Sequence, residues 1–129
     1  MTAYIPHAPD LPSALPESGW VVACLCAAWC GTCTEYRPRF EALARARTDA
    51  LFVWIDIEDH PEYLGDEDVE DFPTVVVQRH GQTCFFGPML PHIGHLDRLL
   101  DALHDNAPTV NAGTLPDLGA LLMARQSVT

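Results

Sequence analysis

Two cysteines separated by two residues, Cys30 and Cys33, are the residues of this chain best suited to chemistry. A pair at this spacing can close a small disulfide ring and open it again. An apolar run precedes the pair and a helical pattern follows it, so the first thiol is predicted to lie at a helix N-terminus. The unpaired N–H groups and the dipole there favour the thiolate, which is the nucleophile in disulfide exchange. The pair therefore indicates thiol–disulfide redox chemistry.

The elements that would position this pair alternate between strands and helices. Buried strands are predicted at 20–26, 51–57 and 74–79, and a short strand at 83–86 pairs with the third in a hairpin. Apolar residues at helical spacing predict helices at about 30–47 and 92–104, and a short helix lies within 59–70. Before residue 20 we expect at most an edge strand near 3–5 and a helical turn near 13–15. This order predicts an α/β fold.

Length and charge narrow the classes of protein that fit. The 129 residues, 48% of them hydrophobic, are enough for one domain, 1–129. A net charge of −11 with only 7 Lys and Arg argues against nucleic acid as a partner. No apolar run approaches the ~18 residues that span a membrane. The first residues lack a basic region followed by an apolar run, so we expect no signal peptide and a cytoplasmic location.

Acidic residues concentrate in one stretch of the chain. They are Asp56, Glu58, Asp59, Glu62, Asp66, Glu67, Asp68, Glu70 and Asp71. They form either an ordinary solvated face or a surface that selects basic partners and repels anions. In the second case Asp71, two residues before Pro73, would make anionic glutathione a poor substrate.

The spacing of several motifs resembles the thioredoxin family over about residues 20–103. The matching residues are Trp29-Cys30-Gly31-Thr32-Cys33, Pro38, Pro61, Val69 to Thr74 with Phe72-Pro73-Thr74 at its end, Gly81 and Gly87. The resemblance implies a thioredoxin fold, an α/β fold with a central mixed sheet of about four to five strands flanked by helices. The core would span about 20–104, and 105–129 would be a C-terminal helical extension of the same domain.

The resemblance also implies an activity, thiol–disulfide oxidoreduction on protein disulfide substrates. Cys30 would attack, Cys33 would resolve, and the redox-active disulfide would be Cys30–Cys33, with no other cofactor. An external reductase or thiol pool would supply electrons. The expected substrate-binding residues are Trp29, Gly31, Thr32, Asp71, Phe72, Pro73 and Gly87, and the Phe72–Pro73 bond would be cis.

Two positions depart from the family pattern. Six residues before Cys30 the thioredoxins proper carry a buried aspartate, and here Cys24 stands there. The position of its lysine partner is Trp54. Either both simply fill volume, or Cys24 is a third participating thiol beside Cys33. Loss of the ion pair also keeps a second function open, a thioredoxin-fold binding or chaperone-like module with weak turnover.

Four cysteines that lie close together in the sequence are candidate metal ligands. Cys24, Cys26, Cys30 and Cys33 lie within ten residues, and a strand points Cys24 and Cys26 to one face. The CxxC pair lies beyond the end of that strand and no second CxxC exists, so we expect no metal site. Cys84 is expected to be a packed strand thiol.

The segment after residue 105 extends past the family's last helix. Residues 114–117 resemble a helix start, and Leu118, Leu121 and Leu122 would share one face. This face could pack on the chain's own sheet edge or helix, dock a partner or a second protomer, or remain disordered.

Overall fold

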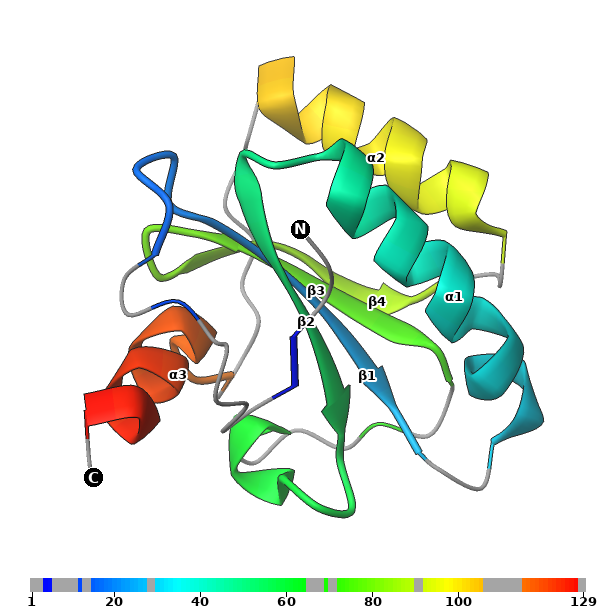
Figure 1. Cartoon of the computed structure of the whole chain (residues 1–129), viewed down its shortest axis with the longest axis horizontal. Helices are drawn as coiled ribbons and strands as arrows, with labels where there is room; N and C mark the ends of the chain where they lie inside the picture. The colour runs from blue at the N-terminus through cyan, green and yellow to red at the C-terminus, as the bar shows by residue number, and fades with distance from the viewer. Residues whose placement is uncertain are drawn as a thin grey trace.

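A computed structural model describes residues 4, 5, 12, 15–27, 30–64, 69, 72–89, 92–105 and 115–127 of the chain. Its elements are β1 (Trp20–Cys26), α1 (Gly31–Ala46), β2 (Ala50–Asp56), the 3-10 helix η1 (Pro61–Leu64), β3 (Thr74–Arg79), β4 (Gln82–Pro88), α2 (Ile93–Asp105) and α3 (Leu118–Ser127). Figure 1 shows helices on both sides of a twisted sheet. The strands and helices predicted between residues 20 and 104 are all present, and β4 is longer than the expected 83–86.

The four strands form one mixed sheet in the order β2-β1-β3-β4. β1 runs parallel to β2 and antiparallel to β3, and β3 pairs antiparallel with β4. Tyr4 adds a parallel bridge to Val53 at the β2 edge, where the edge strand near 3–5 was predicted. The predicted turn at 13–15 lies mostly outside the described residues. The α/β thioredoxin fold predicted from the motifs is therefore the observed fold.

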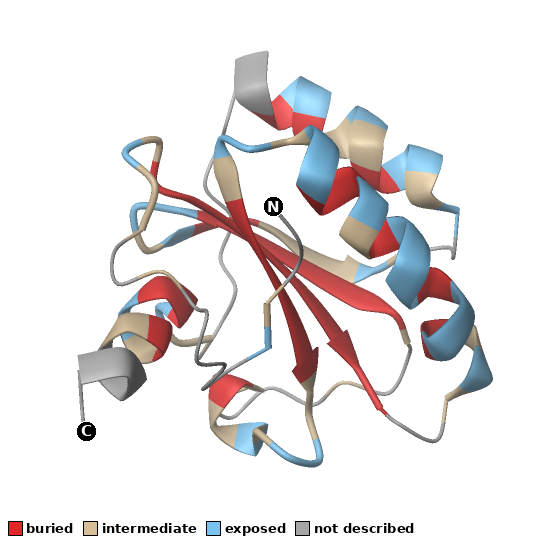
Figure 2. Cartoon of the chain, viewed as in Figure 1, coloured by how far each residue is buried: buried red, intermediate tan, exposed pale blue. Residues whose placement is uncertain are grey.

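α1 and α2 cover one face of the sheet. β1 is buried along its whole length, as a strand covered on both faces must be. On the α1 face Phe40 packs edge-on against Phe52 and Trp54, with ring centroids 5.4 and 5.7 Å apart. Figure 2 shows the buried strands between helices whose outer sides are exposed. This packing holds the middle of α1 against β2.

α3 covers the opposite face together with η1. Leu118 and Leu122 are fully buried in a cluster with residues of β1, β2 and Tyr63 of η1. The helix predicted after 114–117 is thus confirmed, and it packs on the face of the chain's own sheet instead of its edge. Since these leucines are already covered, a dimer through this side of the extension is not shown.

A buried glutamine of β3 ties α3 to the sheet. The Gln78 side-chain amide donates to Thr83 Oγ1 at 3.1 Å and to the Pro116 carbonyl at 2.9 Å. Its Oε1 accepts from the Leu118 backbone N–H at 2.9 Å. Asp117 caps the helix by accepting from the Ala120 N–H at 3.0 Å. These bonds fix where α3 begins.

Candidate active site

The candidate site lies where β1 and β2 end and β3 begins. Parallel pairing places Cys26 beside Asp56, and antiparallel pairing places Leu25 beside Thr74. Continuing the second register by one residue brings Pro73 opposite Cys26. The Phe72–Pro73 peptide bond is cis, as the motif implies. Pro73 is buried and its carbonyl accepts from the Met89 N–H at 3.0 Å.

Cys30 is the N-cap of α1 and is only partly buried. Its backbone is extended, its side chain makes no capping hydrogen bond, and its N–H donates to the Ala27 carbonyl at 3.0 Å. Cys33 follows in the first turn of the helix and is 2% exposed. The sequence order therefore places one thiol at the helix tip and turns the other inward, as predicted.

The disulfide in this structure joins Cys26 to Cys33, and Cys30 is a free cysteine. The expected disulfide was Cys30–Cys33, so the bond in this structure differs from the one expected. Its reason is geometric: Cys26 ends β1 with its side chain on the α1 face, and Cys33 points from α1 toward that strand end. Their Cα atoms are 5.9 Å apart, within the range that disulfides span.

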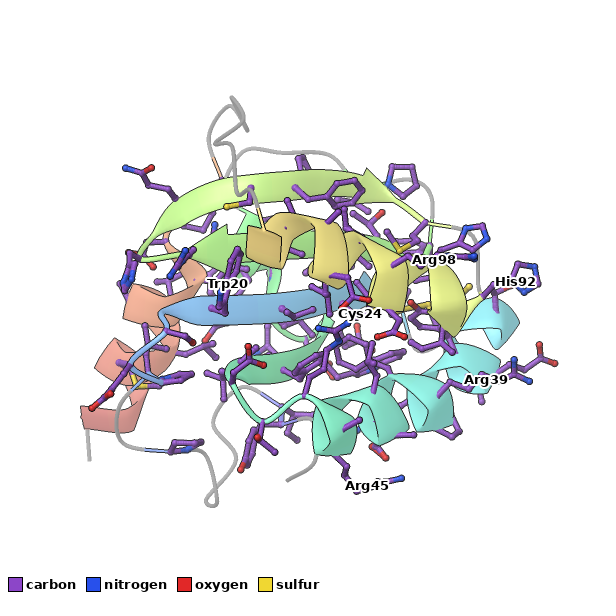
Figure 3. All side chains as sticks on the ribbon, turned by 90° about the horizontal axis from the view of Figure 1, so that it is seen from above. Trp20, Cys24, Arg39, Arg45, His92 and Arg98 are labelled. Carbon is purple, nitrogen blue, oxygen red and sulfur yellow. A yellow bond between two sulfur atoms is a disulfide. The ribbon has the colours of Figure 1, made fainter. Side chains whose placement is uncertain are left out.

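Cys24 lies two residues earlier on the same face of β1 (Figure 3). It is fully buried and free, and its Sγ is 3.6 Å from that of Cys26. Burial raises the pKa of the Cys24 thiol far above its ordinary value. Trp54 pairs with Cys24 across β1 and β2, and the Arg37 guanidinium lies 5.4 Å from its ring centroid. Cys24 and Trp54 are therefore two buried neighbours, neither of which carries a carboxylate or an amine.

Tyr36 of α1 lies in the same buried cluster. Among the described residues its hydroxyl has no hydrogen-bond partner. Burial raises the pKa of Tyr36 well above its usual range, and the interaction with Cys24 adds to this shift. Cys24 and Tyr36 therefore both stay neutral at physiological pH.

A pocket of about 360 Å³ reaches Cys33 from the side of α1 and β2. Its polar lining includes Arg37, Asp56 and His60, and one Asp56 oxygen accepts from the Glu58 N–H at 2.9 Å. Cys33 therefore shares the lining of this pocket with titratable side chains.

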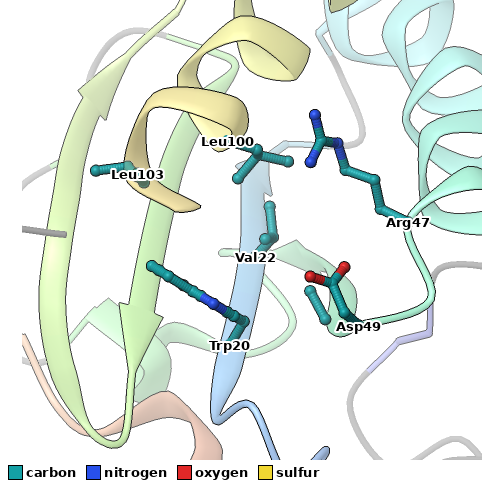
Figure 4. A pocket seen from close by; sticks show the side chains of 7 residues that line it. Trp20, Val22, Arg47, Asp49, Leu100 and Leu103 are labelled. Carbon is teal, nitrogen blue, oxygen red and sulfur yellow. The ribbon is translucent and has the colours of Figure 1, made fainter. Parts of the chain in front are cut away.

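A second cavity, of about 20 Å³, lies between Trp20, Arg47 and Leu100 (Figure 4). It has room for about one water molecule. Trp20 begins β1 and Cys26 ends it, so this cavity is at the far end of the strand from the cysteines. It is too small and too distant to hold a substrate of the thiol site.

Comparison with known proteins agrees with this geometry. Residues 12–87 match the family model described as Thioredoxin. The chain belongs to the thioredoxin family. It is 36% identical over 55 residues to thioredoxin of Mycoplasma genitalium, and this match spans 43% of the chain and 54%, about half, of that relative. With thioredoxin-1 of Schizosaccharomyces pombe the identity is 24% over 82 residues, spanning 64% of the chain and 80% of the relative.

Solved structures show the same fold. The germline-specific thioredoxin Deadhead of Drosophila melanogaster superposes with a TM-score of 0.61 at 24% identity, covering 67% of this chain and 83% of Deadhead. Oxidised mitochondrial thioredoxin 3 of Saccharomyces cerevisiae superposes with a TM-score of 0.60 at 25% identity. The match covers 67% of this chain and 81% of the yeast protein. Identities this low leave the activity to be argued from the site.

The remaining site residues expected of a thioredoxin-family chain fall into two groups. Trp29 and Asp71 lie outside the described residues. Gly31 is the first residue of α1 and has free space at its Cβ position, and Thr32 after it is partly exposed. Phe72 is partly buried and packs against the cluster that contains Cys33. Gly87 lies on β4 opposite Val75. No bound substrate tests their roles, which stay predictions.

Sequence reasoning missed three residues of this thioredoxin-like site. Cys26 was treated only as a metal-ligand candidate, although the strand pattern already placed it on the face of Cys24. Asp56 was counted only with the acidic stretch, and His60 was not singled out. The signal for Asp56 was its position at the end of a strand parallel to β1, where it lies beside Cys26.

No helix among the described residues is long and apolar enough to cross a bilayer. The same part of the chain holds no group of three or more His, Cys, Asp or Glu side chains arranged to bind a metal ion.

Proposed function

We propose that this chain is a thiol–disulfide oxidoreductase that reduces disulfides in protein substrates. The observation that supports it is the pairing of a free, partly exposed Cys30 at the tip of α1 with a buried Cys33 in the first turn of the same helix. Residues three apart on a helix are neighbours, so Cys33 is within reach of a sulfur bonded to Cys30. Family membership points to the same chemistry.

The reaction takes two exchanges. The Cys30 thiolate attacks one sulfur of a substrate disulfide, forming a mixed disulfide and releasing the other substrate sulfur as a thiolate. The Cys33 thiolate then attacks Cys30 Sγ, which releases the second substrate thiolate and leaves a Cys30–Cys33 disulfide. The substrate gains two electrons and the dithiol loses them. An external reductase or thiol pool restores the dithiol.

Cys33 must lose its proton before it can attack. Burial disfavours a thiolate, and Cys24 cannot replace the family's aspartate as a proton acceptor because its own proton is held tightly. The pocket beside Cys33 offers another acceptor, the carboxylate of Asp56, with His60 close by on the same wall. We therefore assign proton removal to Asp56, directly or through pocket water.

Substrate binding follows from the end of β3. The cis Phe72–Pro73 segment enters the sheet next to the end of β1, where it could present backbone groups to an extended substrate segment. The remaining rim would come from Trp29, Gly31, Thr32, Asp71 and Gly87. The proposed place of action is the cytoplasm, where a CxxC pair is more often redox-active than structural.

Reduction of insulin disulfides by dithiothreitol, followed by turbidity, tests this function. The wild-type chain should accelerate precipitation, and Cys30→Ser should remove the acceleration. Cys84→Ser, which alters a buried free cysteine on β4, is the matched control and should behave as wild type. Unchanged acceleration in Cys30→Ser would refute the assigned chemistry. A wild-type chain that does not accelerate precipitation would favour the binding or chaperone-like module.

A further inference from the structure

We propose that Cys26 is a third redox-active cysteine. It displaces Cys30 from the disulfide with Cys33 and so moves this disulfide into the core of the protein. The inference rests on the proposed function for the origin of the first disulfide. It assigns a new residue to the reaction, because the motif spacing points only to Cys30 and Cys33.

The structure supports this exchange through three observations. Cys26 and Cys33 are bonded to each other while Cys30 is free. Cys26 is 1% exposed and Cys33 is 2% exposed, so the bond lies inside the α1 face of the sheet. Cys30, partly exposed, packs against the same cluster that contains both bonded cysteines.

Cys33 therefore has two cysteines as possible partners, one from β1 and one from the start of α1. Cys30 precedes it by one helical turn at the tip of α1. Cys26 faces it from the end of β1, with Cα atoms 5.9 Å apart. Both possible partners of Cys33 lie at the same end of the sheet, so the exchange needs only a local rearrangement of the chain.

The exchange balances without an external oxidant. After resolution the Cys30–Cys33 disulfide is attacked at Cys33 Sγ by the Cys26 thiolate. The bond between Cys26 and Cys33 forms, the bond between Cys30 and Cys33 breaks, and the electron pair leaves on Cys30 as a thiolate. The proton that Cys26 releases is matched by the one that Cys30 takes up from solvent. The number of disulfides stays at one.

This exchange changes what the oxidised protein can do. With the disulfide at Cys26–Cys33, Cys30 is again a nucleophile, but Cys33 is no longer available to resolve a mixed disulfide. The oxidised chain would then capture a second disulfide and hold it as a stable adduct on Cys30. With the disulfide at Cys30–Cys33, the chain has no accessible nucleophile at the helix tip.

Disulfide mapping distinguishes the two forms directly. Trypsin cannot be used, because the first Arg or Lys of the chain is Arg37 and the four cysteines that precede it would share one peptide. Chymotrypsin can cleave after Leu25, Trp29 and Tyr36, which separates Cys26 from the pair. The reduced protein is oxidised with one equivalent of diamide, quenched in acid, alkylated with N-ethylmaleimide and digested.

The proposal expects peptide 26–29 linked to peptide 30–36, with the label on Cys30, as the main product. Peptide 30–36 with an internal disulfide and label on Cys26 as the only product would overturn it. A linked peptide carrying Cys24 in place of Cys26 would overturn it as well and would make Cys24 the third thiol.

Thiol counting with 5,5′-dithiobis(2-nitrobenzoate) on the folded, oxidised protein gives an independent measure. The wild type should release about one equivalent of thionitrobenzoate rapidly and keep the adduct on Cys30. Cys26→Ser should release none in this fast phase, because its disulfide must be Cys30–Cys33, and Cys84→Ser should match the wild type. Equal fast release by wild type and Cys26→Ser would refute the exchange.

These outcomes are separate from the test of the proposed function. In one outcome, insulin reduction depends on Cys30 and the map shows only the Cys30–Cys33 disulfide. This result would support the proposed oxidoreductase function and refute the role of Cys26. A Cys26–Cys33 bond in a protein without insulin-reducing activity would remove the proposed function and leave the buried pair.

Discussion

The side chain of Gln78 should be the main polar attachment of α3 to the sheet. We expect Gln78→Met, which keeps the length of the side chain and removes its amide, to weaken this attachment. The substitution deletes the bonds to Thr83, to the Pro116 carbonyl and from the Leu118 N–H. Leu118 is fully buried, so water cannot easily replace the bond to its N–H.

The magnitude follows from the number of bonds lost. A buried hydrogen bond contributes about 1 kcal/mol net, and an abandoned buried partner costs about 1–3 kcal/mol. Three such bonds predict a loss of about 3 kcal/mol in the free energy of unfolding. For a domain of this size this loss corresponds to a decrease of roughly 10 °C in Tm.

Urea unfolding under reducing conditions measures the effect without a contribution from disulfide exchange. Gln82→Met is the matched control, since Gln82 is exposed on the neighbouring strand, and should change stability by less than about 0.5 kcal/mol. Amide exchange should also become faster in α3 than in α1 of the Gln78 variant. A Gln78→Met protein as stable as the control would refute this account of how α3 is held.

Three further changes test the core around the cysteines. Tyr36→Phe removes a buried hydroxyl without a described partner and should raise the free energy of unfolding by about 1 kcal/mol in urea melts; a loss of that size would show that the hydroxyl is bonded. Burial raises the pKa of Cys24, so the unfolded chain gives up this proton first and stability should fall as pH rises above about 9. Cys24→Ala should make that decline shallower, and an identical slope would contradict it. Asp56→Asn should slow stopped-flow decay of the Cys30 mixed disulfide at pH 7 several-fold, and unchanged decay would exclude Asp56 as the proton acceptor for Cys33.

The strands and the large helices could be predicted because each carries its own local pattern. The apolar run 20–26 and the helical spacing of Tyr36, Phe40 and Leu43 report burial directly. His80 and Gly81 both have positive φ, the conformation of a two-residue hairpin turn, and the sequence showed it through the glycine. Elements whose existence depends on local pattern were therefore found within a few residues of their ends.

The side of the sheet that α3 would cover could not be predicted in the same way. Leu118 and Leu122 show that the helix has an apolar face, but nothing local says which surface meets it. Gln78, which follows three valines in β3, makes the hydrogen bonds that fix the start of α3 on this side. In the sequence Gln78 resembles the solvent-facing end of a strand, and only the fold shows that its amide meets the start of α3.

The disulfide partner of Cys33 was missed for a related reason. Strand periodicity correctly placed Cys24 and Cys26 on one face, and the order of strand, CxxC pair and helix correctly placed Cys30 at the tip of α1. What decides between Cys26 and Cys30 is how closely the first turn of α1 approaches the last residue of β1. We expect this distance to depend on Phe40, which packs against Phe52 and Trp54 of β2 farther along the helix. If that packing sets the distance, Phe40→Ala should leave the CxxC sequence intact and still reduce the share of the Cys26–Cys33 disulfide in the chymotryptic map. The same share in Phe40→Ala, with the fold retained by circular dichroism, would mean that the loop between β1 and α1 fixes the pairing by itself.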